Sequence, residues 1–274
     1  MNPTSLIILV AFFFAAVTAA PQPNQGRPDD PEPELIFITF ILYSYIFVTT
    51  CGGIVNAYSA SIEFQLGGSI RADMRCVWIV QTPYFTKRFN LIASGLKETD
   101  GLYITAVSIV GLSSSEKLST IGQNVTVTSR SAMITLIVGH APTLGFKMEF
   151  YSSGGSSVAP YVTSYTILTT AKGNVTYPSN GGNYGNYEIA LFPIAASVPG
   201  QPTLRFTRVD LESEPTCAYD SIKIYNWFDG NYLQVAIFCG NTIPTSVTLQ
   251  DGVGVVLFKS DLSWTRTGFD FQYE

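Results

Sequence analysis

Apolar and polar residues alternate with a period of two in the C-terminal part of this chain. RFTRVDL and DSIKIYNW, between Arg205 and Trp227, show this alternation, and the apolar run VVLFKS follows; the three runs are short and are separated by turn residues. A period of two is that of a β-strand with one buried face. No long apolar stripe with a period of 3.6 residues follows Thr50, so we expect an all-β fold of antiparallel β-sandwiches.

After Thr50 the sequence divides into two similar halves. RCVWIVQTPYFTKRFNLIASGL in the first half matches EIALFPIAASVPGQPTLRFTRVDL in the second, and TLGFKMEFY near the end of the first parallels RTGFDFQYE. A Ser/Gly-rich segment lies between the halves and has the composition of a flexible joint. We therefore predict a first domain over residues 51–151, a linker over 152–160 and a second domain over 161–274.

The first fifty residues carry signals of another kind. Residues 1–20 combine a short apolar run with the small residues Thr18 and Ala20, which predicts a secretory signal peptide and its cleavage site. Residues 21–34 are rich in proline and polar residues and cannot build a core. Leu35 to Thr50 is nearly continuously apolar, and we interpret it either as strands leading into the first domain or as a membrane anchor.

Charge narrows the classes of partner. The chain has 274 residues, a net charge of −5 and no cluster of lysine or arginine. Nucleic acids and anionic membrane surfaces attract basic patches, so this composition argues against both as partners. The two Asn-Val-Thr sequons, at Asn124 and Asn174, are predicted N-glycosylation sites if the chain is secreted.

Four cysteines and their surroundings resemble those of the CUB domain family. Cys76-Val-Trp78 is similar to the Cys-x-Trp strand of that family, and Cys217 and Cys239 flank its central strands. The resemblance implies a jelly-roll-type β-sandwich in each half, with disulfides Cys51–Cys76 and Cys217–Cys239. CUB domains usually bind other molecules and catalyse nothing, so the resemblance implies an extracellular binding protein.

The second half also resembles the CUB domains that hold a calcium ion. Glu212, the Tyr-Asp pair that ends at Asp220 and the Ser-Asp pair that ends at Asp261 match the acidic ligand positions of those domains. We also include Ser263, two residues after Asp261, among the expected calcium-site residues. Three converging carboxylates repel each other without a cation, whereas calcium takes 6–8 oxygen ligands. The alternative is three independent, solvated loop acids.

A tyrosine from an Asn-Tyr turn completes the calcium site in the family. Tyr184 and Tyr187 both follow an asparagine, and Tyr184 fits the spacing better. Trp264 departs from the pattern, because the family often has a polar ligand there.

The first half does not match the same pattern. Asp100 can take the aspartate position, but spacing places Ile92 and Val138 where the two other acids are expected. We therefore expect no calcium in the first domain, which would act as a spacer or as a separate binding face.

Catalytic patterns are absent from the sequence. His140 is the single histidine, and no Gly-x-Ser-x-Gly or His-Glu-x-x-His motif accompanies it. The Gly-rich run GGNYGN lacks a phosphate-binding pattern. We predict a secreted, non-enzymatic protein that recognises a protein or glycan partner, in part through a basic side chain of that partner, by calcium-ordered loops of the second domain. The alternatives are a structural matrix component without a specific ligand and a membrane-tethered ectodomain anchored by Leu35 to Thr50.

Overall fold

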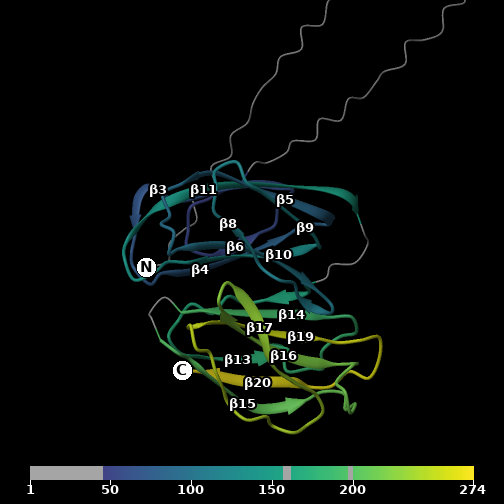
Figure 1. Cartoon of the computed structure of the whole chain (residues 1–274). Helices are drawn as coiled ribbons and strands as arrows, with labels where there is room; N and C mark the ends of the chain where they lie inside the picture. Colours follow the sequence, from purple (N-terminus) through teal and green to yellow (C-terminus); the bar gives the residue numbers. More distant parts are fainter. Residues whose placement is uncertain (1–45, 157–161, 197–199) are drawn as a thin grey trace, which may run out of the picture.

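Strands form all of the regular structure in the described part of the chain. The computed structural model describes residues 46–156, 162–196 and 200–274 (Figure 1). The predicted signal peptide, the Pro-rich segment and residues 35–45 lie outside these ranges. Within them, we find no helix whose length and apolar character would let it cross a membrane.

The first half contains two sheets. Sheet A has the order β1-β3-β11-β5-β9, with β1 (Ile46–Val48), β3 (Ser59–Ile70), β11 (Thr143–Ser156), β5 (Tyr84–Ser94) and β9 (Asn124–Thr128). Sheet B has the order β2-β4-β10-β6-β7, with β2 (Gly53–Val55), β4 (Arg75–Gln81), β10 (Ser131–Ile137), β6 (Gly101–Ser108) and β7 (Gly111–Leu112), and β8 (Glu116–Leu118) also pairs with β6.

The second half contains two further sheets. Sheet C has the order β12-β14-β19-β16-β17, with β12 (Ser164–Tyr165), β14 (Ile189–Ala195), β19 (Val253–Lys259), β16 (Ser221–Phe228) and β17 (Asn231–Phe238). Sheet D has the order β13-β20-β15-β18, with β13 (Gly173–Tyr177), β20 (Gly268–Tyr273), β15 (Thr203–Asp210) and β18 (Val247–Thr248).

The all-β prediction is confirmed, and the two halves have the same topology. The central pairings β4-β10-β6 and β3-β11-β5 of the first half correspond to β14-β19-β16 and β13-β20-β15 of the second. These pairings are antiparallel, whereas β1, β2 and β12 join their sheets as short parallel strands. Each half buries its own aromatic core between its sheets, with Trp78 against Phe146 in the first and Phe258 against Phe269 in the second.

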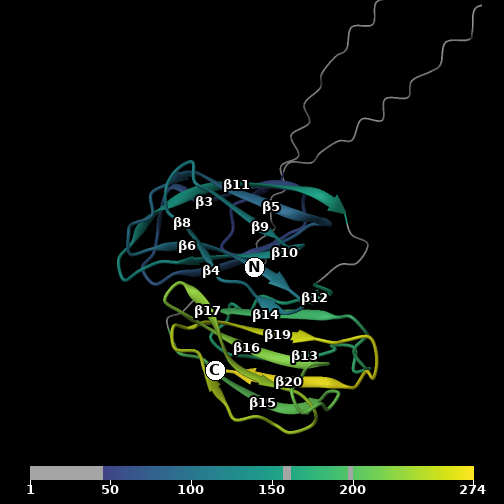
Figure 2. The ribbon, with the colours of Figure 1, turned by 45° about the vertical axis from the view of Figure 1, so that its right-hand side comes forward.

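The outer faces of sheets B and C pack against each other (Figures 1 and 2). A third apolar cluster joins Ile79 and Met133 of the first half to Leu191 and Val255 of the second. Strands β10, β14 and β19 are therefore buried on both faces, and a strand buried on both faces has a continuous apolar sequence instead of an alternating one.

Polar and aromatic contacts fix this interface. The hydroxyls of Thr135 and Tyr232 are 2.9 Å apart in a buried hydrogen bond, and the ring of Trp227 meets that of Tyr103 edge-on with centroids 4.9 Å apart. The Gln81 side chain donates to the carbonyl oxygen of Val162 at 2.9 Å. Hydrogen bonds and ring contacts of this kind orient the two halves relative to each other.

Strands of the first half extend beyond the expected bounds of the first domain at both ends. β11 continues to Ser156 and pairs with β5, so residues 152–156 of the predicted linker are strand, while 157–161 lie outside the described residues. Ile46–Val48, in the apolar segment that ends at Thr50, forms β1 on the edge of sheet A. This part of the segment is strand, as the first of the two interpretations expected.

Candidate metal centre

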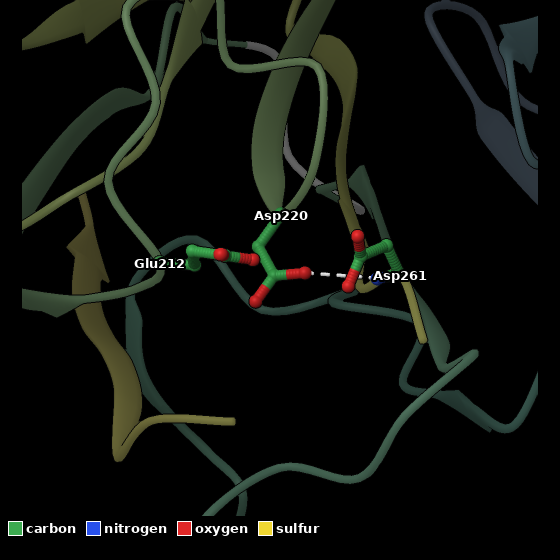
Figure 3. A group of neighbouring side chains, drawn as sticks. All are labelled: Glu212, Asp220 and Asp261. Atoms are coloured by element: carbon green, nitrogen blue, oxygen red, sulfur yellow. Dashed lines mark hydrogen bonds between the residues drawn. The ribbon is translucent and has the colours of Figure 1, made fainter. Parts of the chain in front are cut away.

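Three acidic side chains from separate loops meet at one end of the second half. Glu212 follows β15, Asp220 precedes β16 and Asp261 follows β19. β16 and β19 are antiparallel neighbours, with Ser221 opposite Lys259, so Asp220 and the chain after β19 lie at the same end of sheet C. One carboxylate oxygen from each residue lies within 4.8 Å of the others, and the side chains converge (Figure 3).

Asp220, the central aspartate, is fully buried, and both of its carboxylate oxygens accept hydrogen bonds. One oxygen of Asp220 accepts the backbone N–H of Asp261 at 2.9 Å, and the other accepts the hydroxyl of Tyr184 at 2.5 Å. In contrast, Oε2 of Glu212 is buried and has no hydrogen-bond partner. A buried carboxylate oxygen without a donor costs free energy, and a cation bound between these groups would remove that cost.

The pKa values of two of these acids reflect the same arrangement. Burial raises the pKa of the Asp220 carboxyl, against the opposing effect of its two hydrogen bonds. Burial also raises the pKa of Glu212, and the negative charges of Asp220 and Asp261 add to that rise. Both effects favour the neutral acid, and a bound divalent cation reverses them by favouring the charged form.

Of the two candidate tyrosines, the structure places Tyr184 at the cluster. Its ring is buried, and its hydroxyl donates to Asp220 while accepting the backbone N–H of Glu212 at 3.2 Å. Burial, followed by the hydrogen bond to Asp220, raises the pKa of Tyr184, so the hydroxyl keeps its proton. The ring of Tyr187 is exposed, and only its backbone N–H reaches the site, on the carbonyl oxygen of Asp261 at 2.7 Å.

The chain after Asp261 contributes backbone contacts. The N–H of Ser263 donates to Oδ1 of Asp261 at 2.9 Å, which orients that carboxylate. Trp264, the departure from the family pattern, is exposed and has a positive φ of 57°.

Ser260 has a structural role that the sequence pattern did not indicate. Its buried hydroxyl donates to the carbonyl oxygen of Gly185 at 2.7 Å and accepts the N–H of Glu188 at 2.9 Å. These bonds join the loop that carries Tyr184 to the loop that carries Asp261. The Ser-Asp pair was visible in the sequence, but only the structure shows that its serine holds two loops together.

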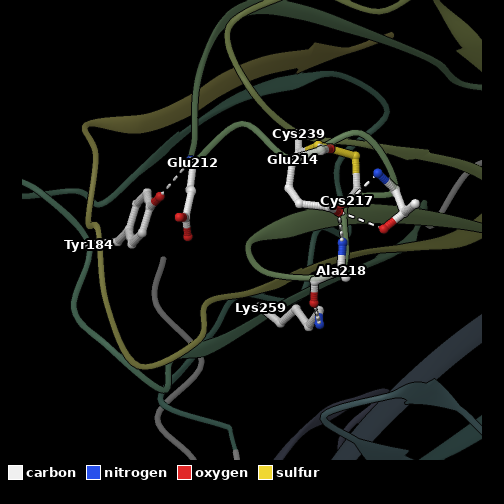
Figure 4. The surroundings of a disulfide bond; sticks show 8 residues. Tyr184, Glu212, Glu214, Cys217, Ala218, Cys239 and Lys259 are labelled. Carbon is white, nitrogen blue, oxygen red and sulfur yellow. Dashed lines mark hydrogen bonds between the residues drawn. A yellow bond between two sulfur atoms is a disulfide. The ribbon is translucent and has the colours of Figure 1, made fainter.

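The disulfide Cys217–Cys239 fixes the loop between Glu212 and Asp220 (Figure 4). In this loop, a carboxylate oxygen of Glu214 accepts the backbone N–H of Ala218 at 2.8 Å, and Lys259 donates to the carbonyl oxygen of Ala218 at 2.7 Å. The loop is thus ordered by a covalent bond and by polar contacts. The structure also contains the disulfide Cys51–Cys76 in the first half.

The remaining predicted residues lie away from the cluster. Asn124 and Asn174 are exposed on the edge strands β9 and β13. Nδ1 of the exposed His140 ring lies 2.7 Å from Oδ1 of Asp73, at hydrogen-bond distance. In the first half, Asp100 is buried and accepts backbone N–H groups with both of its oxygens.

Comparison with known proteins identifies the family. Residues 164–273 match the family model of the CUB domain. The chain is similar to cubilin of Sus scrofa, 26% identical over 238 residues that cover 81% of this chain and 6% of cubilin. It is also similar to exoskeleton protein RP43 of Riftia pachyptila, 23% identical over 241 residues that cover 82% of this chain and 54% of that protein.

Among solved structures, the chain is similar to the MASP-1 CUB2 domain bound to Ca²⁺, with 26% identity, a TM-score of 0.34, and coverage of 39% of this chain and 96% of that one. The alignments span between 6% and 54% of the length of the two curated relatives named above. The match to the family model covers the second sandwich, and together with the similarity to cubilin it supports a CUB-domain protein.

Proposed function

We propose that this chain is a secreted, non-catalytic binding protein whose second CUB domain holds a calcium ion and uses the loops around it to bind an extracellular protein or glycan. The observation that supports the ion is the convergence of Glu212, Asp220 and Asp261 around a buried carboxylate oxygen that has no donor. All the groups available there are oxygens, which are the ligands that calcium takes in proteins.

In this proposal, each residue of the site has a separate task. Glu212, Asp220 and Asp261 hold the ion, and Tyr184 positions Asp220 through its hydroxyl. Ser263 orients Asp261 through its backbone N–H. Calcium would supply positive charge that lets the three carboxylates stay ionised together, and it would order the loops that carry them.

The charge balance at the loops favours a basic group on the partner. Three carboxylates and one calcium ion would together carry a charge of −1. A lysine or arginine side chain of the partner can approach this charge with a charge-assisted hydrogen bond.

A structural role in an extracellular matrix is the second candidate. It is favoured by the similarity to the exoskeleton protein RP43, which extends over 82% of this chain and so includes both halves. A structural component would need no ion for its contacts, so calcium dependence distinguishes the two functions.

Isothermal titration calorimetry of the whole chain with calcium chloride tests the ion. We expect one site in the second domain, with Kd on the order of 10⁻⁴–10⁻³ M, which is common for extracellular calcium modules. Magnesium should bind more weakly, because it requires a nearly octahedral shell and gives up water reluctantly. If no heat of calcium binding is detected at millimolar concentrations, the calcium-dependent function is ruled out and the structural one remains.

A further inference from the structure

The four sheets leave eight edges, and most of them are short. Strands with only two or three residues form five of these edges in the described part of the chain: β1, β2, β7, β12 and β18. A short edge strand offers few free N–H and C=O groups, and shortness is one of the ways in which proteins prevent edge-to-edge pairing.

Two longer edges carry glycosylation sequons. β9 and β13 have five residues each, and they begin at or next to the exposed asparagines Asn124 and Asn174. A glycan on either side chain would be bulky and would obstruct the approach of another strand. These two edges therefore have the means of protection that the shorter edges do not need.

The remaining edge, β17, is neither short nor beside a sequon, and a single bulge is its protective feature. It has eight residues, contains no charged residue, proline or sequon, and pairs with β16 alone. Leu233, Val235 and Ile237 are exposed to 48%, 49% and 41%. A bulge lies between Gln234 and Ala236 and takes Val235 out of the pairing with β16. Long, uncharged, apolar edges are the ones that pair with other strands.

The surface beside this edge continues onto the first domain. Lys223 lies opposite Ile237 in the ladder, and its amine donates to the carbonyl oxygen of Val110 at 2.7 Å. Val110, in the turn between β6 and β7, is 77% exposed. The β16–β17 hairpin itself reaches the first domain (Figures 1 and 2). There, the side chain of Asn231 accepts the N–H of Ser115 at 2.8 Å.

We propose that β17 pairs antiparallel with β17 of a second copy of this chain, so that sheet C continues across a two-fold dimer. The free backbone N–H and C=O groups of the edge can form a ladder with another strand. Antiparallel pairing of a strand with its own copy satisfies two-fold symmetry. A strand without charges meets no like charge in that pairing, and its aliphatic side chains bury each other. This proposal does not depend on calcium.

Sedimentation velocity of the whole glycosylated chain over a range of concentrations tests the dimer. We expect the mass to rise from that of one chain to that of two, with no change on adding EDTA. Val235→Lys and Leu233→Lys each bring one positive charge from each copy into the paired strands near the two-fold axis, and each should shift the dissociation constant at least about tenfold, which corresponds to about 1.4 kcal/mol. Ile121→Lys, at an exposed turn residue of the first domain, is the matched control and should leave the dimer intact.

Hydrogen–deuterium exchange gives a second measurement that does not require a variant. The amides of β17 should become more protected as the protein concentration rises, while those of β9 and β13 should not change. A chain that stays monomeric up to its solubility limit, with exchange of β17 independent of concentration, would overturn the proposal. So would a dimer that both β17 variants and the Ile121 control leave unchanged.

Discussion

The two halves place an aspartate at the same point of the fold and satisfy it differently. Asp100 precedes β6 and Asp220 precedes β16, and these strands correspond in the topology of sheets B and C. Both side chains are buried, with exposures of 2% and 0%. Each accepts, at 2.9 Å, the backbone N–H of a residue that follows the neighbouring strand, Gly139 in the first half and Asp261 in the second.

The second contact distinguishes the two aspartates. In the first half, the backbone N–H of Lys97 donates to Asp100 at 2.7 Å, so backbone donors satisfy both oxygens. In the second half, the other oxygen of Asp220 accepts the hydroxyl of Tyr184, and two further carboxylates lie beside it. A buried aspartate at this point of the fold thus joins two loops through backbone hydrogen bonds in the first half, whereas in the second half it belongs to a group of three acids.

Strand pairing shows which residues of the first half correspond to the acids of the second. Ser94 pairs with Phe146 in the first half, and Val209 pairs with Phe269 at the equivalent place in the second. Lys97 lies three residues after Ser94, and Glu212 lies three residues after Val209. The first-half residues at the acidic positions are therefore Lys97 and Gly139, and the assignment of Ile92 and Val138 from sequence spacing was wrong. The error arose because the loop between Lys97 and Asp100 is shorter than that between Glu212 and Asp220.

The largest effect should come from removing the central acid of the second half. Asp220→Asn keeps the size of the side chain but removes its charge, and we expect calcium binding to fall below detection by calorimetry. Asp100→Asn in the first half is the matched control and should leave calcium binding unchanged. Equal loss in both variants would contradict the assignment of the site to the second domain.

Removing the carboxylate of Asp100 should have a smaller effect, which is on the stability of the first half. Asp100→Ala leaves the N–H of Gly139 without its acceptor, whereas the N–H of Lys97 keeps the hydroxyl of Thr143 at 3.1 Å. We expect a loss of about 1–3 kcal/mol in the free energy of unfolding, measured with denaturant, that calcium does not restore. Asp251→Ala, at an exposed position, is the control and should change stability little.

Much of the second half could be predicted from sequence because its pattern is local. The alternation in β15 and β20 and the Tyr-Asp and Ser-Asp pairs indicated the strands and the acids that follow them. Tyr184 was preferred over Tyr187 on spacing, and the structure shows the physical difference, since only Tyr184 is buried against Asp220.

The packing between the halves could not be predicted from local patterns. β14 and β19 are apolar on both faces, and a short apolar run does not reveal which other strand covers it. The buried contact of Tyr232 with Thr135 joins residues 97 positions apart, so the local sequence of neither strand predicts it. Lys97 was not recognised as the counterpart of Glu212, because the loop from Lys97 to Asp100 is shorter than the loop from Glu212 to Asp220 and so changes the spacing.

Calcium should raise the stability of the second half only modestly. A site with Kd on the order of 10⁻⁴–10⁻³ M stabilises the fold by about 0.5–1.5 kcal/mol at millimolar calcium. The expected result is a small rise in melting temperature that Asp261→Asn removes and Asp100→Asn does not. A rise of equal size in the Asp261 variant would show that calcium acts elsewhere on the chain.

The smallest effect we predict is the pH dependence of the calcium-free site. A carboxyl whose pKa is raised on folding stabilises the folded state below its unfolded pKa, which is about 3.9 for Asp and 4.3 for Glu. This stabilisation is lost as the pH rises through the raised pKa values of Asp220 and Glu212. The effect is small because the hydrogen bonds of Asp220 to Tyr184 and Asp261 oppose the rise.

The comparison of the wild-type chain with the double variant Asp220→Asn, Glu212→Gln isolates this contribution. Other carboxyls, such as Asp270 beside Arg208, have lowered pKa values and lose their stabilisation as the pH falls, but they titrate equally in both proteins. In EDTA, the melting temperature of the wild type relative to the variant should therefore decrease from about pH 4 to neutral pH. Saturating calcium should abolish that decrease, because the ion binds the charged carboxylates of the wild type. A difference that stays constant over this range in EDTA would mean that the two acids do not share a buried site.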